Sequence, residues 1–360
     1  MDLGALKTVL SFGSFLALTP PKNQNLNISI PQKLYIVAMF LFHVICLTTT
    51  LMLKNWQYSQ SILLSTVLRI LQEVVLFAYS LYTLIVAGLT KRRQWFLLVR
   101  ILTRVECEIN KEKTLYILFF VSNVMYLALS IYNVFFWTKA LGVRFIKTFI
   151  LELLPIYSQF FITVVTCAIL KMIQSRYKYQ KVLLNLHFTH ARKQLSHMIL
   201  LNVKRNLLAL KDAVDHFNDI FGWNTLLNIF FIALRSLHYL DSVIKKENPI
   251  ASRVPESNWQ VVSRSSFMLI FWVGIFSVIL WCDAIREEYE ELVSYCYEMQ
   301  ECLDNSIFEE DDMCAFTKSV SQNSPEFTAA RYFYIDRSAI FSIMNSITTF
   351  LLVLIQFKSL

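Results

Sequence analysis

The chain has 360 residues, of which 56% are hydrophobic and 29 are phenylalanine, and its mean hydropathy is +0.48. A soluble domain has only about 45–50% apolar residues, so the long apolar runs of this chain indicate an all-α membrane protein. The net charge of +8 comes from basic residues spread over several loops without a binding fold, which excludes a nucleic-acid-binding protein.

The first apolar segment, residues 8–18, imitates the hydrophobic core of a secretory signal peptide. Asp2 precedes it, no small-x-small cleavage site follows it, and Pro20-Pro21 ends it. These features are not those of a signal peptide. We therefore expect a short helix lying at the membrane interface.

Seven later segments are long and apolar enough to cross a membrane, which takes about 20 residues of helix. The second and fourth have room to tilt or to project into water. Because no internal repeat is present, the chain is predicted to be one seven-helix domain, 1–360. The predicted spans are about 33–53, 61–89, 114–137, 145–173, 221–244, 267–285 and 332–357.

Lysine and arginine set the predicted orientation, because short cytoplasmic loops are enriched in both. The segments 1–33, 91–113, 171–211 and 286–331 hold 22 such residues, and the opposite side holds 9. The amino terminus is therefore predicted to be cytoplasmic and the carboxy terminus extracellular. This orientation is the reverse of a G-protein-coupled receptor, and none of the seven cysteines falls in a predicted outer loop.

The predicted cytoplasmic segments are longer than connecting loops need to be. Residues 176–219 continue the helical pattern of the fourth span and are basic, whereas the stretch after the sixth span is strongly acidic. The opposite charges predict that the two segments pack together, within or between subunits, although both could equally be solvated faces. His187, His190 and His197 lack an acidic or thiolate partner, so no metal site is predicted.

Charged residues inside the spans suggest a ligand site, because a charge at membrane depth must be paired or reach water. Arg69 and Glu73 are four residues apart and can pair on one helix face. Two compatible interpretations stay open: an ion-pair network linking spans two, four and five, or an outward-opening pocket for a small molecule. The candidate ligand-binding residues are Arg69, Glu73, Tyr126, Asn133, Glu152, Tyr157, Arg235 and His238.

The last span carries a line of polar residues on one helix face, at Ser338, Ser342, Asn345, Thr349 and Gln356. A lipid-facing helix gains nothing from such a line. The line therefore faces either a neighbouring helix, where hydroxyl residues are common, or a water-filled pore. Leu352 and Val353 interrupt it before Gln356, as expected for an apolar constriction beside a polar ring.

The end of the chain resembles the insect gustatory receptors, within the superfamily that includes the insect olfactory receptors. The resemblance rests on Thr349-Phe350, five aliphatic residues, and Gln356-Phe357, where Phe350 replaces the usual tyrosine. The stretch 327–336 resembles the family's lead-in to the last helix, and 210–222 resembles its junction before the fifth span.

The resemblance implies a tastant-gated, non-selective cation channel that passes Na⁺, K⁺ and Ca²⁺ in the plasma membrane of sensory neurons. It implies a tetramer, homomeric or heteromeric, that needs no G protein. Helices in 1–175 and 221–285 would hold the tastant, 176–220 and 286–330 would anchor the subunits, and 331–357 would be the pore helix. The implied pore and gate residues are Ser342, Asn345, Thr349, Leu352, Val353, Gln356 and Phe357.

The compact chain favours bitter or other small plant compounds, since sugar receptors of this family have longer chains. A secondary transporter is the main alternative, because buried Arg and Glu also suit a coupled carrier, and a G-protein-coupled receptor is a more remote one. The chain shows no nucleophile–base pair and no metal constellation, so the sequence predicts neither an enzyme nor a cofactor.

Overall fold

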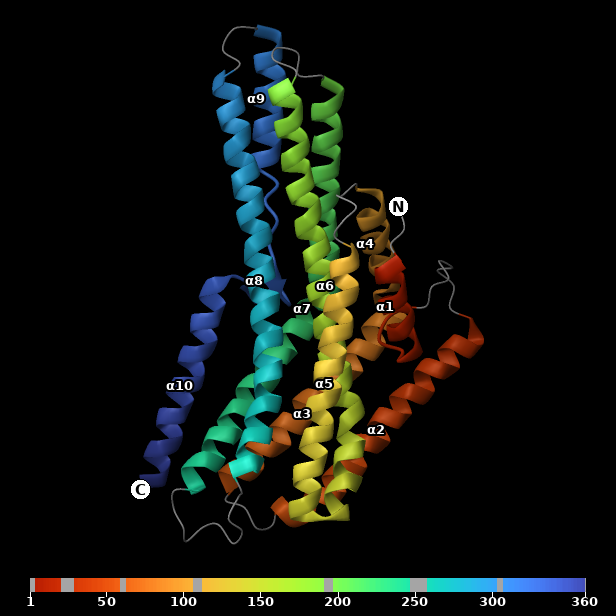
Figure 1. Cartoon of the computed structure of the whole chain (residues 1–360), viewed down its shortest axis with the longest axis vertical. Helices are drawn as coiled ribbons and strands as arrows, with labels where there is room; N and C mark the ends of the chain where they lie inside the picture. The colour runs from red at the N-terminus through yellow and green to blue at the C-terminus, as the bar shows by residue number, and fades with distance from the viewer. Residues whose placement is uncertain are drawn as a thin grey trace.

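The computed structural model describes residues 4–20, 29–58, 63–105, 112–190, 197–246, 258–302 and 307–359. These residues fold into an elongated bundle of helices with one small hairpin (Figure 1). The elements are α1 (Gly4–Phe15), α2 (Ile30–Tyr58), α3 (Leu63–Ile85), η1 (Val86–Thr90), α4 (Arg92–Arg104), α5 (Glu112–Leu141), α6 (Val143–His190), α7 (His197–Lys246), α8 (Asn258–Cys302), α9 (Ile307–Ser321), β1 (Thr328–Ala329), β2 (Phe333–Tyr334) and α10 (Arg337–Ser359).

The predicted spans agree with these helices. Six of them, α2, α3, α5, α6, α7 and α8, are long and apolar enough to cross a membrane, and α10 contributes a shorter apolar segment, Arg337–Val353. Helices α6 and α7 have 48 and 50 residues, so both extend well beyond one membrane thickness. The prediction that the fourth span continues as a long helix is confirmed as far as His190, and a separate helix, α7, begins at His197.

The expected interfacial segment forms α1, which packs beside α5 and α6. The ring of Phe12 lies 6.3 Å from that of Phe119 and 5.7 Å from that of Phe161. The turn after α1 is closed by a 2.7 Å hydrogen bond from the Thr19 hydroxyl to the Leu10 carbonyl oxygen. The aromatic contacts hold α1 against the bundle.

Beyond the membrane-length segments, α6, α7, α8 and α9 form the upper part of the molecule in Figure 1. Its interior is mainly apolar, with Tyr177 and Leu184 of α6 buried together with Leu292 of α8. Lys181 of α6 forms an ion pair with Glu291 of α8, and this hydrogen bond lowers the pKa of the Glu291 carboxyl. The predicted packing of the basic and acidic segments is therefore confirmed within one subunit.

The last helix begins later than predicted, at Arg337 instead of residue 331 or 332. Residues 328–334 form an antiparallel hairpin in which Thr328 pairs with Tyr334 and Ala329 with Phe333. Its turn contains Ala330 and Arg331 with φ values of 51° and 64°, in the left-handed region that non-glycine residues rarely adopt. A helix cannot include Ala330 and Arg331, and Phe333 and Tyr334 are paired in the hairpin, so the start predicted at 331 or 332 was wrong.

Gly222 lets α7 approach this hairpin closely. A Cβ atom at position 222 would lie 2.8 Å from the Ala330 backbone nitrogen, whereas one at Gly274 would meet only a Thr163 methyl group, at 3.0 Å. We expect Gly222→Ala to destabilise the fold by about 1–3 kcal/mol, the usual cost of overpacking.

Gly274→Ala is the matched control, because both changes raise helix propensity by a similar amount. The measurement is the thermal unfolding of detergent-purified protein. Equal melting temperatures for the two variants would show that the hairpin does not depend on Gly222.

Candidate functional site

Aromatic side chains from three helices meet around Tyr126 of α5. The ring of Tyr126 stacks on Phe160 of α6 at 4.5 Å and lies 5.4 Å from Tyr157. It also lies 5.8 Å from the ring of Phe267 of α8. Tyr126 is only 3% exposed, so this aromatic cluster (Tyr126, Tyr157, Phe160 and Phe267) lies in the interior.

Arg235 of α7 joins the cluster from a fourth helix. Its guanidinium carbon lies 5.2 Å from the ring centre of Phe267, 5.4 Å from that of Phe271 and 5.6 Å from that of Phe231. Three ring faces within 6 Å of one cation stabilise its charge in an apolar setting. The cluster thus combines a cation with electron-rich rings.

Polar groups at the edge of the cluster are mostly hydrogen-bonded to the protein. The Tyr157 hydroxyl donates to Asn123 Oδ1 at 2.8 Å, and Ser263 donates to Asn133 Oδ1 at 2.8 Å. The Tyr126 hydroxyl faces the Ser130 hydroxyl, and neither forms a well-aligned hydrogen bond to a described group. This buried hydroxyl is therefore available to a ligand or to water.

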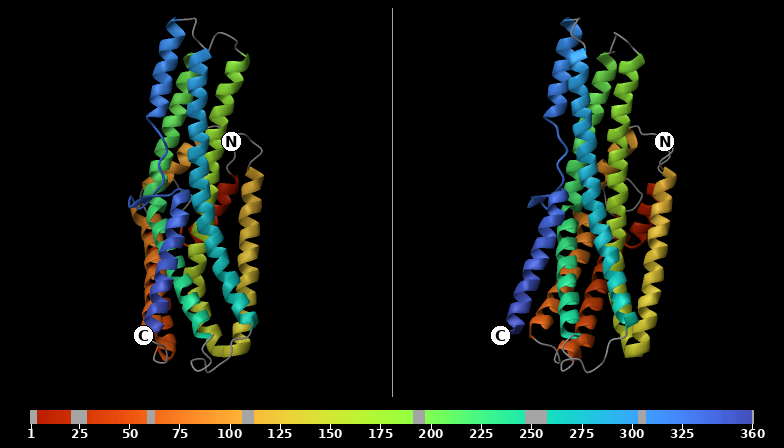
Figure 2. Two further views of the ribbon diagram at one scale, coloured as in Figure 1. Left: turned by 90° about the vertical axis from the view of Figure 1, so that its left-hand side faces the viewer. Right: turned by 60° about the vertical axis from the view of Figure 1, so that its left-hand side comes forward.

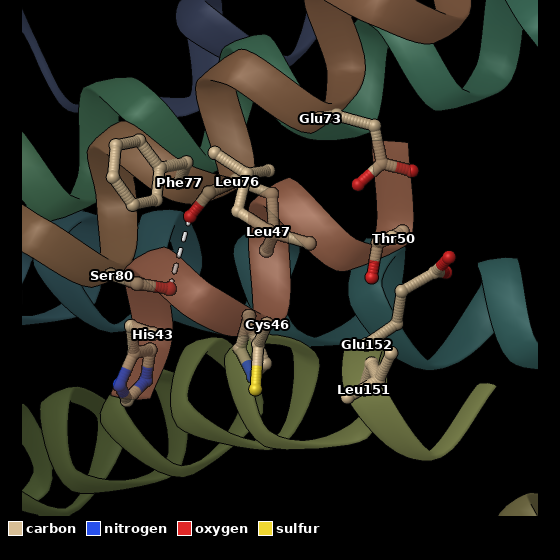
Figure 3. A pocket seen from close by; sticks show the side chains of 11 residues that line it. His43, Cys46, Leu47, Thr50, Glu73, Leu76, Phe77, Ser80, Leu151 and Glu152 are labelled. Carbon is tan, nitrogen blue, oxygen red and sulfur yellow. Dashed lines mark hydrogen bonds between the residues drawn. The ribbon is translucent and has the colours of Figure 1, made fainter. Parts of the chain in front are cut away.

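Two other candidate residues, Glu73 of α3 and Glu152 of α6, line a different cavity between α2, α3 and α6. Its volume is about 10 Å³, about the space of a single water molecule. Figure 3 shows Glu73, Thr50 and Glu152 on one side of it, with His43 on the other. His43 hydrogen-bonds through Nδ1 to the Met39 carbonyl oxygen at 2.9 Å, and sequence reasoning missed it.

The eight candidate ligand residues thus fall into two groups instead of one pocket. Tyr126, Tyr157 and Arg235 belong to the aromatic cluster, and Asn133 lies at its edge. Arg69 lies one turn before Glu73 on α3, and His238 lies three residues after Arg235 on α7; both are half-buried. The ion-pair network linking these spans stays a prediction.

A buried chain of amides and hydroxyls connects α3, α6 and α7. Gln159 donates to Asn228 Oδ1 at 2.7 Å, and Asn228 donates to the Thr163 hydroxyl at 3.2 Å. The Thr83 hydroxyl donates to Asn224 Oδ1 at 3.1 Å. All five residues are polar and lie inside predicted spans. This sequence pattern could have identified them as candidates.

Helix α10 lies on the outside of the bundle, against α7 and α8 (Figure 2). It packs through one strip: Ala339 and Ile347 are 6% and 7% exposed, and Ile340 and Ile343 contact the core. Ile347 lies nine residues from both Ser338 and Gln356, and nine residues make about two and a half turns. The predicted polar line therefore lies opposite the strip that packs on the subunit.

All five residues of that polar line are exposed in the single subunit. Leu352 and Val353, which flank the line, are 55% and 39% exposed. The side chain of Phe357 lies outside the described part of the chain, as do those of His187, His190 and His197. Among the described residues, no group of three metal-ligating side chains occurs.

The start of α10 is bound to α8 by ion pairs. Arg337 Nε lies 2.5 Å from Asp283 Oδ2, and Arg337 Nη2 lies 2.8 Å from Glu287 Oε1. Asp336 caps the helix by accepting hydrogen bonds from the Ser338 hydroxyl and the Ala339 amide, and these bonds lower its pKa. The first turn of α10 is therefore fixed both to its own cap and to α8.

The comparisons with known proteins agree with this architecture. The sequence profile of the 7tm chemosensory receptor family matches residues 6–360. The fold resembles the insect olfactory receptor OR5 from Machilis hrabei in complex with eugenol, with a TM-score of 0.69 and 13% identity over 98% of this chain and 97% of that chain. A second OR5 structure gives a TM-score of 0.63, also at 13% identity, over 98% and 96%. No curated protein sequence matches the chain.

The match over almost the whole length shows that the chain belongs to the 7tm chemosensory receptor family. It is therefore a seven-span membrane receptor, with α10 as the seventh span, and not an enzyme. The predicted fold class and the superfamily are confirmed.

Arg337 is the ion-pair partner of Asp283, whose side chain is only 7% exposed. We expect Arg337→Ala to lower the stability of the purified receptor by about 1–3 kcal/mol, because it leaves Asp283 buried without its main counter-charge. Thermal unfolding measures the loss.

Two variants sharpen this test. Arg286→Ala removes an exposed ion pair with Glu290 and should change stability little. The double change Arg337→Met with Asp283→Leu should recover most of the loss, because it removes both charges together. If Arg337→Ala and Arg286→Ala behave alike, the Arg337 ion pairs do not hold α10.

Proposed function

We propose that the chain is a gustatory receptor: a tastant-gated, non-selective cation channel of four subunits whose pore is lined by α10. The observation that carries this proposal is the exposed polar line on the face of α10 opposite its packing strip. Four copies arranged around an axis would turn four such lines toward one water-filled path. The tetramer is either homomeric or formed with related receptors.

Contact with lipid would suit this line poorly. Hydroxyl residues can bond to their own helix, as the Ser342 hydroxyl does to the Ser338 carbonyl oxygen at 3.1 Å. The carboxamides of Asn345 and Gln356 have more donors and acceptors than a helix backbone can satisfy. Water or the amides of neighbouring subunits would satisfy them in a pore.

The proposed pore has its polar ring at Gln356 and its apolar constriction at Leu352 and Val353, one turn earlier. An apolar ring closes a narrow pore by excluding water. Ser342, Asn345 and Thr349 would line the wider part, and Phe357 would follow Gln356 at the narrow end. The permeating ions are proposed to be Na⁺, K⁺ and Ca²⁺.

The aromatic cluster is the proposed tastant site. OR5, which shares the fold, is described in complex with eugenol, a small aromatic molecule. Stacked rings, one cation and one buried hydroxyl suit a small, mostly apolar ring compound. These features support a ligand from the bitter or other small plant compounds, with Asn133 and His238 at the edge of the cluster. Glu73 and Glu152 line the separate small cavity, and Arg69 lies one turn before Glu73.

The proposed orientation has the amino terminus in the cytoplasm and the carboxy terminus outside, in the plasma membrane of sensory neurons. The surplus of Lys and Arg on the α4 and α6–α7 side supports it. In this orientation the α6–α9 extension is a cytoplasmic anchor between subunits. The cavity with Glu73 and Glu152 is the one feature that favours the alternative of a secondary transporter.

Gln356→Glu tests the pore. Four carboxylates at one level would attract divalent cations, so the permeability to Ca²⁺ relative to Na⁺, or the block by Ca²⁺, should rise severalfold. Whole-cell reversal potentials in shifted calcium measure the ratio, after surface labelling has confirmed normal expression.

Ile355→Ala is the neighbouring control, since Ile355 lies away from the polar line and should leave the ratio unchanged. Unaltered permeability in Gln356→Glu at normal surface levels would place Gln356 outside any pore and would weaken the channel proposal.

Tyr126→Phe tests the ligand site. Removing a hydroxyl without a described partner should leave the melting temperature unchanged or raise it slightly. If that hydroxyl bonds the tastant, the half-activating concentration should rise about five- to tenfold, equivalent to about 1–1.5 kcal/mol. Calcium imaging against a panel of plant compounds gives both the agonist and the shift.

Tyr157→Phe provides the contrast, because the hydroxyl of Tyr157 already bonds Asn123. This variant should lower the melting temperature. An agonist whose potency is the same in wild type and Tyr126→Phe does not hydrogen-bond to Tyr126.

A further inference from the structure

A second, larger cavity of about 450 Å³ lies where α3, η1, α7 and the β1–β2 hairpin meet. One part of its lining is apolar or aromatic and includes Tyr82, Ile85 and Trp223. The other part carries the charges of Lys91, Asp219 and Arg331. An amphipathic cavity of this size suits a ligand with a charged head and an apolar body.

The cavity lies at one boundary of the membrane. The apolar span of α3 ends at Ile85, and the basic run Lys91-Arg92-Arg93 follows within one to two turns. Trp223 and Tyr332 are 42% and 72% exposed, with ring centres 5.9 Å apart. Exposed tryptophan and tyrosine are typical of the headgroup level of a bilayer. The head of a membrane lipid therefore reaches this depth.

The charges of the lining are arranged as complementary sites. Arg331 Nη2 lies 3.2 Å from Asp219 Oδ1, while the Arg331 side chain stays 84% exposed and can bind a second anion. Arg331 adopts a left-handed backbone conformation, which non-glycine residues rarely adopt. With Lys91 the lining offers two cations for a phosphodiester, and the Asp219 carboxylate is a counter-charge for an ammonium group.

The exposed face of α3 continues this site into the membrane. Val67, Leu71, Val74 and Ile85 lie on one side of the helix, and each is between 39% and 49% exposed. At about 1.5 Å per residue, the stretch from Val67 to Ile85 is about 27 Å long. An acyl chain that begins at the cavity can therefore lie along α3 for its full length.

We propose that this cavity binds the headgroup of an amine-bearing glycerophospholipid. The phosphodiester binds Lys91 and Arg331, the ammonium group faces Asp219 and the rings of Tyr82 and Trp223, and an acyl chain lies on α3. Aromatic rings 6.3 Å apart beside a carboxylate form a suitable site for an ammonium group. A polyphosphorylated headgroup would bring excess negative charge next to Asp219.

The bound lipid would connect three elements around one cavity. It would join the end of α3 to α7 through Asp219 and Trp223, and both to the turn of the hairpin through Arg331. The hairpin leads within a few residues to Arg337 and the start of α10. The lipid is therefore a structural component of the junction before the last helix, whatever that helix conducts.

Native mass spectrometry of the full-length receptor tests the proposal, with phosphatidylethanolamine titrated into the detergent-purified protein. Lys91→Gln should weaken binding about tenfold, the usual effect of losing one charge-assisted hydrogen bond. Lys91→Arg should retain most of the affinity. Arg93→Gln is the matched control, because the exposed Arg93 carries the same charge two residues away but does not line the cavity.

Lipid competition separates the headgroup chemistries. The wild type should bind phosphatidylethanolamine more tightly than phosphatidylglycerol, and Asp219→Asn should remove that preference while leaving phosphatidylglycerol bound. An equal loss in Arg93→Gln and Lys91→Gln would overturn the site. Equal competition by soluble phosphoethanolamine would show a phosphate site without a lipid, and preference for a phosphoinositide would refute the amine assignment.

Discussion

The arrangement of α10 is the constraint on which the rest of the molecule depends. It packs on its own subunit through a single strip around Ile343 and Ile347, while Phe341 and Phe350 are 76% and 61% exposed. Apolar side chains at these positions suit contact with lipid or with a neighbouring helix. The polar line does not suit contact with lipid. One subunit cannot satisfy both faces. The exposed faces of α10 therefore support the proposal that neighbouring subunits surround it.

Helix α8 connects the two parts of the proposed mechanism. Phe267 and Phe271 contact the aromatic cluster, and Asp283, about 24 Å further along at 1.5 Å per residue, binds Arg337. Beyond Asp283, Leu292 and Cys296 are fully buried against α6 and α7, so this end of the helix cannot shift freely. A ligand that tilts α8 at Phe267 would thus displace Asp283, because the helix would pivot about its buried end near Leu292 and Cys296. Coupling of this kind requires two arrangements of α8 with different ligand affinity.

The positions of the helices could be predicted from sequence, because they depend on the spacing of apolar residues and the length of apolar segments. Both are local properties of the chain. The long helices α6 and α7 followed from an uninterrupted pattern without proline between residues 176 and 219. The hairpin before α10 could not be predicted in this way, because its strands have two residues each and its left-handed turn contains alanine and arginine, not glycine. The division of the candidate ligand residues into two groups also escaped prediction. Depth in the membrane places Glu73 and Tyr126 at a similar level, but α3 packs against α2 whereas α5 packs against α8, and this separates them.

That separation bears on the kind of ligand. The aromatic cluster presents aromatic rings, the Arg235 guanidinium and the Tyr126 hydroxyl. A sugar needs many hydrogen bonds, and each of its hydroxyls that stays unpaired in a buried site costs about 1–3 kcal/mol. A planar apolar compound with one acceptor loses far less, and it suits the aromatic composition of the cluster. The carboxylates, which could bind sugar hydroxyls, lie in a cavity that holds about one water molecule. The chemistry of the cluster therefore supports the proposal of an apolar aromatic ligand over a carbohydrate.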